Sequence, residues 1–443
     1  MQRARGRRDG SAAPCRQEID RIDAELARLY TERMAAAREI AACKREAGLP
    51  VFDPAREREV LTSAAARIAD PTLRPGYLAL LRQLMDQSKR LQRSEQPESE
   101  TVLPVLLPDG TYPVLVADGL LARAKEHLDL DRNVFLVTDS GVPAQYARTL
   151  AAQCRRAELV TVPAGEASKS MGQFESILTG LQQGGWKRGD CVAAVGGGMV
   201  GDLAGFAAAC YLRGIDFYHI PTTLLAMVDA SVGGKTALNL GGVKNSVGAF
   251  SRPKAVLIDP SLLDTLPPRQ LAAGMAEVVK MALTSDADLF ADLEQGRTID
   301  RRQLIVRALR IKISVVEADE REAGPRRVLN FGHTLGHGIE AAQKGALLHG
   351  ECVALGMLPM CSPAVRERLL PLLTRLGLPT GANFDPEAAL AAIARDKKAA
   401  AEGICAVTVR EIGSWDMEEM PLSELRQRLL TVTAPVDGRD HRP

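Results

Sequence analysis

Half of the histidines in this chain lie in one short segment. The sequence has six histidines among 443 residues, and three of them are His333, His337 and His349. Imidazole is the commonest metal ligand in proteins, and it titrates near neutral pH without help from its surroundings. His333 and His337 are four residues apart, so they share one face of a helix. This spacing leaves two possibilities open: both bind a metal ion, or one binds and the other works beside it.

A carboxylate upstream could complete such a site. Glu277 lies in the apolar, helix-like run at residues 274–280, where an unpaired carboxylate would be costly. Lys280, about one turn later, could pair with it or face a substrate. One carboxylate and two imidazoles form a ligand set for a catalytic Zn²⁺ that keeps one position open. A single histidine on an apolar face is usually an ordinary core residue, but three with flanking glycines favour a site.

A glycine-rich segment follows a run with the character of a buried strand. Residues 196–202 read G-G-G-M-V-G-D and satisfy the pattern G-x-G-x-x-G before a helical stretch. Such glycines let the backbone approach a pyrophosphate, and the helix N-terminus attracts the anion. An ordinary Rossmann dehydrogenase would place an acidic residue at the end of the next strand, whereas Asp216 precedes residues 217–220. The pattern indicates a dinucleotide site without requiring such a dehydrogenase.

A second glycine-rich segment, residues 231–236, superficially suggests the Walker A phosphate loop. That motif requires a glycine at the position of Asp229, so we exclude it. Lys235, Lys244 and Asn245 are nevertheless candidates for binding anions and hydroxyl groups. Taken singly, each lysine could equally be an exposed turn residue.

The bulk composition excludes several classes of partner. The chain has 56 basic and 55 acidic residues, so no overall attraction to nucleic acid or to a membrane follows. Its eight cysteines are scattered without a C-x-x-C pair, as free thiols of a reducing compartment would be. The first residues lack the apolar segment of a signal peptide, and no apolar stretch could span a bilayer. We therefore expect a cytoplasmic protein that acts on small molecules.

The residue pattern changes along the chain. Residues 12–94 are rich in Glu, Arg, Ala and Leu at helical spacing and predict an all-helical domain. Residues 95–101 are polar and contain a proline, which is typical of a linker. Residues 102–261 alternate strands and helices, which predicts a doubly wound α/β domain, and residues 262–432 are expected to be mainly helical. Three buried strands are predicted at 134–139, 191–195 and 255–259.

Together these motifs resemble 3-dehydroquinate synthase, a family of sugar-phosphate cyclases, over about residues 101–430. The motifs are G-E-x-x-K at 165–169, G-G-G-x-x-G-D at 196–202, Y-x-R-G at 211–214, P-T-T-L-L at 221–225, D-x-S-V-G-G-K-T at 229–236, K-N at 244–245, A-E-V-V-K at 276–280, A-D-E-R-E at 318–322, N-F-G-H at 330–333 and H-G-E at 349–351. The resemblance implies a Rossmann-like NAD-binding part followed by a mainly helical metal-binding part.

The resemblance also implies roles for individual residues. A divalent metal, Zn²⁺ or Co²⁺, would be held by Glu277, His333 and His349, while His337 would assist proton transfer without binding the metal. NAD would be held by Glu166, Lys169, Gly197, Gly198, Asp202, Thr222, Thr223, Lys235, Lys244 and Thr265. The substrate would be surrounded by Arg213, Asp229, Lys235, Lys244, Asn245, Lys280, Lys312, Arg326, Asn330 and Lys397, with Lys398 as an alternative to Lys397.

The implied reaction converts 3-deoxy-D-arabino-heptulosonate 7-phosphate to 3-dehydroquinate and phosphate. NAD would oxidise a ring hydroxyl, phosphate would leave, and the ketone would be reduced again before a carbocycle closes. The metal would act as a Lewis acid, and lysine and arginine would bind phosphate and carboxylate. Alternatives are an amino-analogue cyclase, a valiolone-type cyclase and, more distantly, a metal-dependent polyol dehydrogenase, which would accumulate NADH. Arg213, Asn245, Arg326 and His337 favour the dehydroquinate substrate.

The segment at about residues 14–93 resembles the all-helical class of chorismate mutase. Its site residues would be Arg16, Arg33, Lys44, Asp53, Arg56, Glu57, Ser88 and Gln92. Arg33 and Lys44 face the same way on a helix, whereas Arg16 lies about 25 Å before Arg33 at ~1.5 Å per residue. One straight helix cannot bring both arginines to one small ligand. In the family, the arginine equivalent to Arg16 comes from the partner chain of an interlocked dimer, so the resemblance implies a homodimer.

The implied second reaction is the rearrangement of chorismate to prephenate, without a covalent or proton-transfer step. Arg16, Arg33 and Arg56 would bind two carboxylates, and Lys44 and Gln92 would meet the ether oxygen. Catalysis would then rest on preorganised electrostatics and conformational restraint. Two alternatives stay open: a solvated charged helix face, and a non-catalytic domain that senses chorismate or prephenate and forms the dimer.

Overall fold

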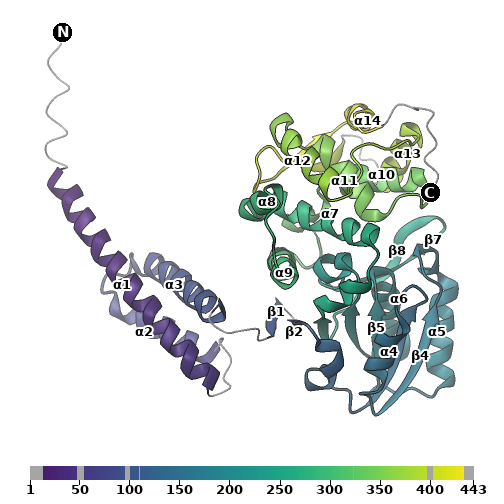
Figure 1. Ribbon diagram of the computed structural model, residues 1–443, viewed down its shortest axis with the longest axis horizontal. Helices are drawn as coiled ribbons and strands as arrows, with labels where there is room; N and C mark the ends of the chain where they lie inside the picture. The colour runs from purple at the N-terminus through teal and green to yellow at the C-terminus, as the bar shows by residue number, and fades with distance from the viewer. Residues whose placement is uncertain are drawn as a thin grey trace, which may run out of the picture. The chain divides into compact units, whose positions relative to one another are not determined.

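The computed structural model describes residues 13–46, 54–94, 100–108, 110–322, 324–396 and 403–433. The chain divides into two compact units, residues 1–99 and residues 100–443. Figure 1 shows helices in the first unit, and a sheet with many helices in the second.

Three helices make up the described part of the first unit: α1 (Ala13–Glu46), α2 (Pro54–Arg67) and α3 (Arg74–Ser94). α1 and α2 each pack against α3. Ala37 and Ala41 of α1 and Ala64 of α2 are buried, and such small side chains let helices approach closely. The helical character expected for this segment is confirmed.

One face of α1 is apolar and exposed. Ile19, Ile22, Leu26, Leu29 and Tyr30 recur at helical spacing, and each is between 43% and 57% exposed. Apolar surface left in water forgoes about 25 cal/mol per Å². A continuous stripe of this kind is typical of an interaction surface.

A seven-stranded sheet forms the first half of the second unit, in the order β1-β2-β9-β6-β5-β3-β4. β1 and β2 are antiparallel, and the other neighbouring strands are parallel. The strands are β1 (Thr101–Leu107), β2 (Gly110–Val116), β3 (Asn133–Asp139), β4 (Arg156–Val162), β5 (Cys191–Gly196), β6 (Asp216–Pro221) and β9 (Ala255–Ile258). The three strands predicted from the sequence are confirmed within a residue.

Alternate residues of the central strands meet different helices, because a strand repeats every two residues. Phe135 of β3 packs in the core that α5 (Met171–Gln183) and α6 (Gly198–Cys210) form on one face. Leu136 packs in the other core, with α4 (Ala144–Ala151). Helices on both faces confirm the predicted doubly wound α/β fold (Figure 1).

The strand order reverses beside β3, which has β4 on one side and β5 on the other. In open α/β sheets, ligands bind outside the carboxyl ends of the strands at such a switch point. β5 ends at Gly196, so the glycine-rich residues 196–202 lie at this point. The fold therefore supports a ligand-binding role for that segment.

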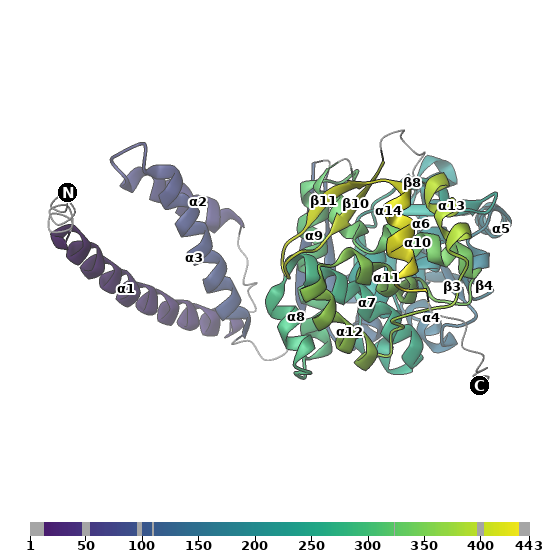
Figure 2. The ribbon, with the colours of Figure 1, turned by 90° about the horizontal axis from the view of Figure 1, so that it is seen from above.

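The rest of the second unit is mainly helical, as expected. Its helices are α7 (Pro268–Ser285), α8 (Ala287–Glu294), α9 (Arg301–Ala318), α10 (His333–Gln343), α11 (His349–Met357), α12 (Pro363–Arg375), α13 (Pro386–Asp396) and α14 (Leu422–Leu430). α10 packs against α11 and α13, and α11 packs against α7. α12, α13 and α14 lie on the side away from the sheet (Figures 1 and 2). A short antiparallel pair, β10 (Ile404–Thr408) and β11 (Asp416–Met420), interrupts the helices.

A hairpin of β7 (Lys235–Leu240) and β8 (Val243–Phe250) stands outside the main sheet. It packs against α6 and buries Leu238, whereas β8 is mostly exposed. Its turn is formed by Gly241 and Gly242, whose φ angles are 60° and 78°. Two-residue hairpin turns need this left-handed backbone, which glycine adopts without strain.

Short 3-10 or π-helical segments connect several of these elements: η1 (Leu120–Glu126), η2 (Glu166–Ser168), η3 (Tyr211–Arg213), η4 (Ala226–Ala230), η5 (Pro260–Thr265), η6 (Pro325–Asn330) and η7 (Leu358–Met360). None of the helices in the described ranges is both long and apolar enough to cross a membrane.

Candidate active site and metal centre

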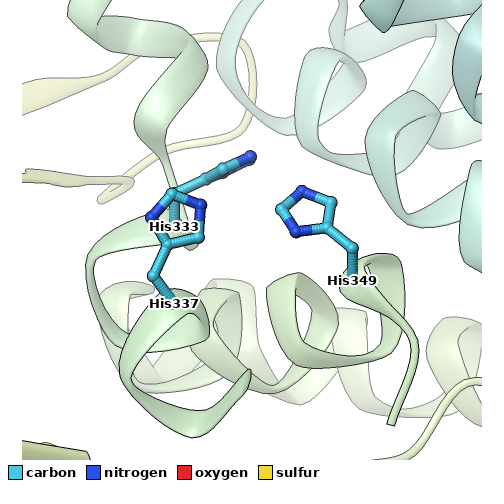
Figure 3. A group of neighbouring side chains, drawn as sticks. All are labelled: His333, His337 and His349. Carbon is cyan, nitrogen blue, oxygen red and sulfur yellow. The ribbon is translucent and has the colours of Figure 1, made fainter. Parts of the chain in front are cut away.

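Three imidazoles meet where α10 and α11 begin. His333 starts α10, His337 follows one turn later, and His349 starts α11. Their ring centroids are 5.2 to 5.7 Å apart, and Figure 3 shows the rings around one common space. Glycines let the helices approach, because a Cβ on Gly356 would come within 2.0 Å of the carbonyl oxygen of Gly332. The flanking glycines noted in the sequence are therefore needed for packing.

Glu277 of α7 reaches the same space. Its Oε1 lies 3.6 Å from Nε2 of His333 and 3.7 Å from Nε2 of His349. The side chain is fully buried, and Oε1 has no hydrogen-bond partner among the described residues, which is unfavourable for a charged oxygen. Three ligand atoms held tetrahedrally at about 2.0–2.1 Å from one ion lie roughly 3.4 Å apart. The chemistry and spacing of these donors therefore fit a divalent metal ion.

The two histidines that face Glu277 are oriented through their other nitrogen. Nδ1 of His333 lies 3.1 Å from the backbone oxygen of Phe331, and Nδ1 of His349 lies 3.2 Å from Oε2 of Glu340. With the proton on Nδ1, the lone pair of Nε2 is directed to the shared space. Sequence reasoning missed Glu340, because its distance from residue 349 along the chain does not indicate a contact between two helices.

The surroundings favour the neutral form of His333. Burial lowers the pKa of His333 well below its usual value, and the charge of Lys280 lowers it further. Neutral imidazole is the form that binds a metal. At Glu340, burial raises the pKa of the carboxyl, but the hydrogen bond to His349 and the charge of Lys244 outweigh it and lower the pKa to about 2. Glu340 is therefore ionised at neutral pH.

A row of alternating buried charges continues from Glu277. Lys280 forms an ion pair with Glu277 and lies 3.9 Å from Asp229 of η4, and Asp229 pairs with Lys312 of α9. Burial alone would raise the pKa of Asp229, but the two lysines lower it. The sequence left open whether Lys280 pairs with Glu277, and the fold shows that it does. Three of the expected substrate residues thus lie beside the histidine–glutamate cluster.

Residues expected to bind NAD gather at the carboxyl ends of β4 and β5. Lys169 follows β4, is buried, and lies 2.5 Å from Asp202 of α6. Burial raises the pKa of Asp202 to about 6, although Lys169 opposes that shift. Gly197 precedes α6 without a side-chain hydrogen bond to the helix, and a Cβ on Gly198 would lie 3.2 Å from Ala230. The first backbone N–H groups of α6 can therefore meet an anion at close range.

The threonines of the expected NAD group differ in their surroundings. Thr222 is buried just after β6, and its N–H donates to the carbonyl of Gly196 at 3.0 Å. Thr223 follows it and accepts a hydrogen bond from the backbone of the next turn. Thr265 ends η5, where its hydroxyl lies 2.8 Å from that of Tyr146. The first two lie at the switch-point edge of the sheet, whereas Thr265 is held by α4.

The β7–β8 hairpin contacts two of the residues expected to bind NAD, Lys169 and Glu166. Asn245 accepts a hydrogen bond from the ammonium of Lys169, and its own N–H donates to Asn239 at 2.9 Å. Asn239 in turn donates to Glu166 at 2.8 Å. Asn245 has a φ of 53°, a left-handed conformation that asparagine tolerates better than most residues.

The same hairpin also reaches the helical half. Lys235 forms an ion pair with Glu322, and Lys244 lies 2.7 Å from Glu340. Asn330 donates to the other oxygen of Glu322 at 2.5 Å. Glu322 stood inside a recognised motif, but sequence reasoning gave it no role.

Arg326 is buried beneath the loop that precedes β7. Its guanidinium donates to the backbone carbonyls of Glu320 and of Gly233, the latter at 3.3 Å. The hydroxyl of Tyr112, from β2, accepts the N–H of Gly233 at 3.2 Å. Arg326 thus binds the carbonyl group of Gly233 and Tyr112 binds its N–H group, and together they fix this loop. No sequence motif indicated the contact with Tyr112.

Arg213 is an expected site residue that this chain does not bring to the others. It ends η3, just before β6 begins at Asp216, whereas the threonines of the NAD group follow the other end of β6 at Pro221. Six strand residues at about 3.3 Å each separate the two ends by roughly 20 Å. The side chain of Arg213 is too short to span that distance to the site of its own chain.

Some expected residues lie outside the described part of the chain: Lys397, its alternative Lys398, and Asp53. The backbones of Arg56 and Glu57 belong to α2 and that of Gln92 to α3, but their side chains are not described.

In the first unit, Arg33 of α1 faces α3. It donates to the backbone oxygen of Leu84 at 2.8 Å and to the hydroxyl of Ser88. Beside it lies a cavity of about 570 Å³, a size typical of small-molecule sites, lined by Arg33, Glu59, Val60, Ser63, Ala64, Arg67, Tyr77, Leu81 and Leu84. Lys44 lies three turns further along α1. Arg16 is exposed on the same unbroken helix, near its N-terminal end. It lies about 25 Å before Arg33 at ~1.5 Å per residue, so it cannot reach this cavity.

Comparison with known families agrees with this geometry. The model of the N-terminal part of 3-dehydroquinate synthase matches residues 159–273, and that of its C-terminal part matches residues 274–399. The model of chorismate mutase type II matches residues 15–93. The 3-dehydroquinate synthase of Rhodospirillum rubrum is 43% identical over 346 residues, which cover 71% of this chain and 90% of the relative. That of Symbiobacterium thermophilum is 43% identical over 319 residues, 66% and 89% of the two chains.

Solved structures show the same fold. A 2-deoxy-scyllo-inosose synthase complexed with carbaglucose-6-phosphate, NAD⁺ and Co²⁺ matches with a TM-score of 0.68 and 25% identity, over 74% of this chain and 99% of the other. ValA, a 2-epi-5-epi-valiolone synthase from Streptomyces hygroscopicus subsp. jinggangensis 5008 with NAD⁺ and Zn²⁺ bound, matches with a TM-score of 0.68 and 30% identity, over 74% and 98%. A butanol dehydrogenase from Thermotoga maritima, 13% identical with a TM-score of 0.53, shares the fold alone.

A doubly wound sheet joined to a helical half that carries a histidine–glutamate cluster, together with these matches, places the chain in the class of sugar-phosphate cyclases. Within that class the chain belongs to the 3-dehydroquinate synthase family, and its first unit is a chorismate mutase type II domain.

Proposed function

We propose that the second unit converts 3-deoxy-D-arabino-heptulosonate 7-phosphate to 3-dehydroquinate and phosphate, and that the first unit converts chorismate to prephenate. The convergence of Glu277, His333 and His349 beside the Lys280–Asp229 charge row is the observation that carries the first activity. The 43% identity to a dehydroquinate synthase, against 25% and 30% to the inosose and valiolone synthases, favours the dehydroquinate substrate.

Glu277, His333 and His349 are the residues that we assign to one divalent metal, with Zn²⁺ as the proposed ion. The related valiolone synthase holds Zn²⁺ and the inosose synthase holds Co²⁺. When bound, the metal supplies Lewis-acid polarisation of substrate oxygens. His337, exposed at the rim of the cluster, is assigned to proton transfer, because a group that exchanges protons with the substrate needs access to it.

NAD is the second proposed cofactor, and when bound it supplies the reversible oxidation of one ring hydroxyl. The open N-terminus of α6 at Gly197 would receive its pyrophosphate, and Asp202 and Lys169 lie beside that point. Both solved relatives named above contain NAD⁺. A cofactor that is reduced and then reoxidised in each turnover would leave no net NADH.

Charged side chains of the chain itself bind and orient the substrate. Lys235 and Lys244 of the hairpin present ammonium groups at the junction of the two halves, where a phosphate or carboxylate can replace Glu322 and Glu340 as their partners. The buried row from Glu277 to Lys312 fixes the position of Asp229, so that its carboxylate can accept hydrogen bonds from substrate hydroxyls.

For the first unit, Arg33 and the cavity beside it carry the proposal. A guanidinium in a cavity of this size can bind a carboxylate of chorismate. The rearrangement needs only a fixed conformation and complementary charge.

We further propose a homodimer. The exposed stripe of α1 needs a covering surface, and Arg16 can complete a cavity only in another chain. Arg213 gives an independent reason in the second unit, since it lies at the wrong end of β6 for its own site. The domain limits 12–94, 95–101, 102–261 and 262–432, and a cytoplasmic location, remain our proposals.

The cyclase is tested by phosphate release from 3-deoxy-D-arabino-heptulosonate 7-phosphate with NAD and Zn²⁺. We expect release that a chelator abolishes and Zn²⁺ restores, with no net NADH, and loss of release in Glu277→Gln. Net NADH formation would identify a dehydrogenase instead. Absence of release despite bound NAD and metal would indicate another sugar phosphate as substrate.

The mutase is tested by the disappearance of chorismate. Arg33→Ala should abolish this activity and leave phosphate release intact. If the unaltered chain does not consume chorismate but chorismate changes the rate of phosphate release, the first unit is a sensor and the mutase proposal is wrong.

A further inference from the structure

The carboxylate of Glu340 contacts two groups from different parts of the second unit. Glu340 lies in α10, and its Oε2 is 3.2 Å from Nδ1 of His349 in α11. Its Oε1 accepts a hydrogen bond of 2.7 Å from Nζ of Lys244 in β8. Only 10% of the Glu340 side chain is exposed, so water competes weakly for either oxygen. One carboxylate therefore serves two partners, one with each oxygen.

The first contact determines which nitrogen His349 presents to a metal. Nδ1 of His349 is directed to Oε2 of Glu340, and the other ring nitrogen, Nε2, faces Oε1 of Glu277 at 3.7 Å. Carboxylates that accept the outer N–H of a metal-binding histidine fix its tautomer and orientation. His349 is the more exposed of the two histidines that face Glu277, so it depends more on such a partner.

The second contact holds the hairpin. β8 is mostly exposed, and its junction with the helical half includes the ion pairs Lys235–Glu322 and Lys244–Glu340. Lys244 lies next to the turn, so its pair with Glu340 restrains the outer end of the hairpin. The position of that end therefore depends on the same carboxylate that orients His349.

We propose that Glu340 is a positioning residue that couples the β7–β8 hairpin to the metal ligand His349. The inference rests on the proposed function for the assignment of His349 as a ligand, and it adds a link between metal binding and the hairpin. Coupling of this kind is reciprocal: a bound metal fixes His349 and Glu340 and steadies Lys244, and a steadied Lys244 improves metal binding.

The first test measures Zn²⁺ affinity by competition with a chromogenic chelator, without NAD or substrate. Glutamine at position 340 keeps the size of the side chain, but its single amide oxygen cannot serve both partners. Glu340→Gln should therefore bind Zn²⁺ about 10- to 100-fold more weakly. Glu340→Asp, which keeps both oxygens on a shorter arm, should recover part of the loss.

The second test measures hydrogen exchange in residues 235–250 with and without Zn²⁺. In the unaltered chain, Zn²⁺ should slow exchange in this hairpin. The slowing should disappear in Glu340→Gln and in Lys244→Met, because each substitution breaks the link at a different end.

Glu294→Gln is the matched control. Glu294 pairs with Arg368 between α8 and α12 and contacts no histidine. The Glu294→Gln chain should therefore match the unaltered chain in Zn²⁺ affinity and in the hydrogen exchange of the hairpin. Unchanged Zn²⁺ affinity in a folded Glu340→Gln, or retained protection in either hairpin-link variant, overturns the inference. If the unaltered chain binds no Zn²⁺, the proposed metal site itself fails, which is a distinguishable result. A Glu340→Gln chain that does not fold leaves the decision to Glu340→Asp and Lys244→Met, in which normal affinity and protection would overturn the inference.

Discussion

Lys280 lies one helical turn after Glu277 in α7, and the two form an ion pair while 1% and 0% of their side chains are exposed. In water-excluded surroundings neither charge can be solvated, so each requires the other. The same carboxylate presents its remaining oxygen to two histidines. The proposed metal site is thus built on a buried ion pair.

Removal of the cation from this pair should lower the free energy of unfolding of the chain. Lys280→Met leaves the carboxylate of Glu277 buried without a partner, which costs about 3–5 kcal/mol. Zn²⁺ supplies positive charge to the same carboxylate, so it should raise the melting temperature of this variant more than that of the unaltered chain. Thermal unfolding with and without Zn²⁺ measures both effects. Lys254→Met, which removes an exposed ammonium 3.6 Å from Asp216, is the control and should cost at most about 1 kcal/mol. Equal losses in the two variants would contradict this prediction.

Gly201 should not tolerate a side chain. A Cβ at this position in α6 would lie 2.4 Å from Cε1 of His219, which β6 presents to the helix. Gly201→Ala should therefore destabilise the fold by about 1–3 kcal/mol through overpacking and weaken NAD binding at the end of the same helix. Chemical denaturation and NAD titration measure the two effects. Gly172→Ala in α5 has open space around its Cβ and should be neutral or slightly stabilising. A Gly201→Ala chain as stable as this control would show that α6 can move away from β6.

The buried His219 should make the fold sensitive to acid. Burial lowers the pKa of His219 from 6.5 to about 4, so the folded chain resists protonation that the unfolded chain accepts. The stability this provides is complete above about pH 6.5 and is lost as the pH falls through 4. Two to three pKa units correspond to roughly 3 kcal/mol. The free energy of unfolding of the unaltered chain should therefore fall by about that much more between pH 7 and pH 4 than that of His219→Gln. Parallel pH profiles of the two chains would refute the assignment.

Two inactive chains should restore phosphate release when they are produced together. Arg213→Ala lacks the arginine that we assign to the partner's site, and His333→Ala lacks a metal ligand of its own site. In a random mixture, half of the dimers are mixed and each has one complete site, so about a quarter of full activity is expected for a two-fold dimer. Glu277→Gln with His333→Ala is the control, because no mixed dimer contains a complete site. Recovery no greater than in this control would place Arg213 in its own chain's site or outside any site.

The sequence by itself determined the types of element and indicated the candidate site residues. The strands at 134–139, 191–195 and 255–259 are apolar runs, whose burial on both faces is a local property of the residues. His333 and His337 are four residues apart, and this spacing alone places them on one face of a helix. The glycines at residues 196–202 indicated a candidate anion site, because residues without a side chain let the backbone approach an anion closely. These features depend on neighbours along the chain, so they could be predicted without the fold.

Only the tertiary structure decided which distant residues meet. Glu340 joins Lys244 to His349 across 96 and 9 residues of sequence, and Lys280 turned toward Glu277 and Asp229 rather than into solvent. Arg213, which a motif assigned to the site, lies at the far end of β6, because a strand separates its two ends by its full length. Contacts between elements depend on how the helices and strands pack, and that packing is set by the whole core, which no local pattern records.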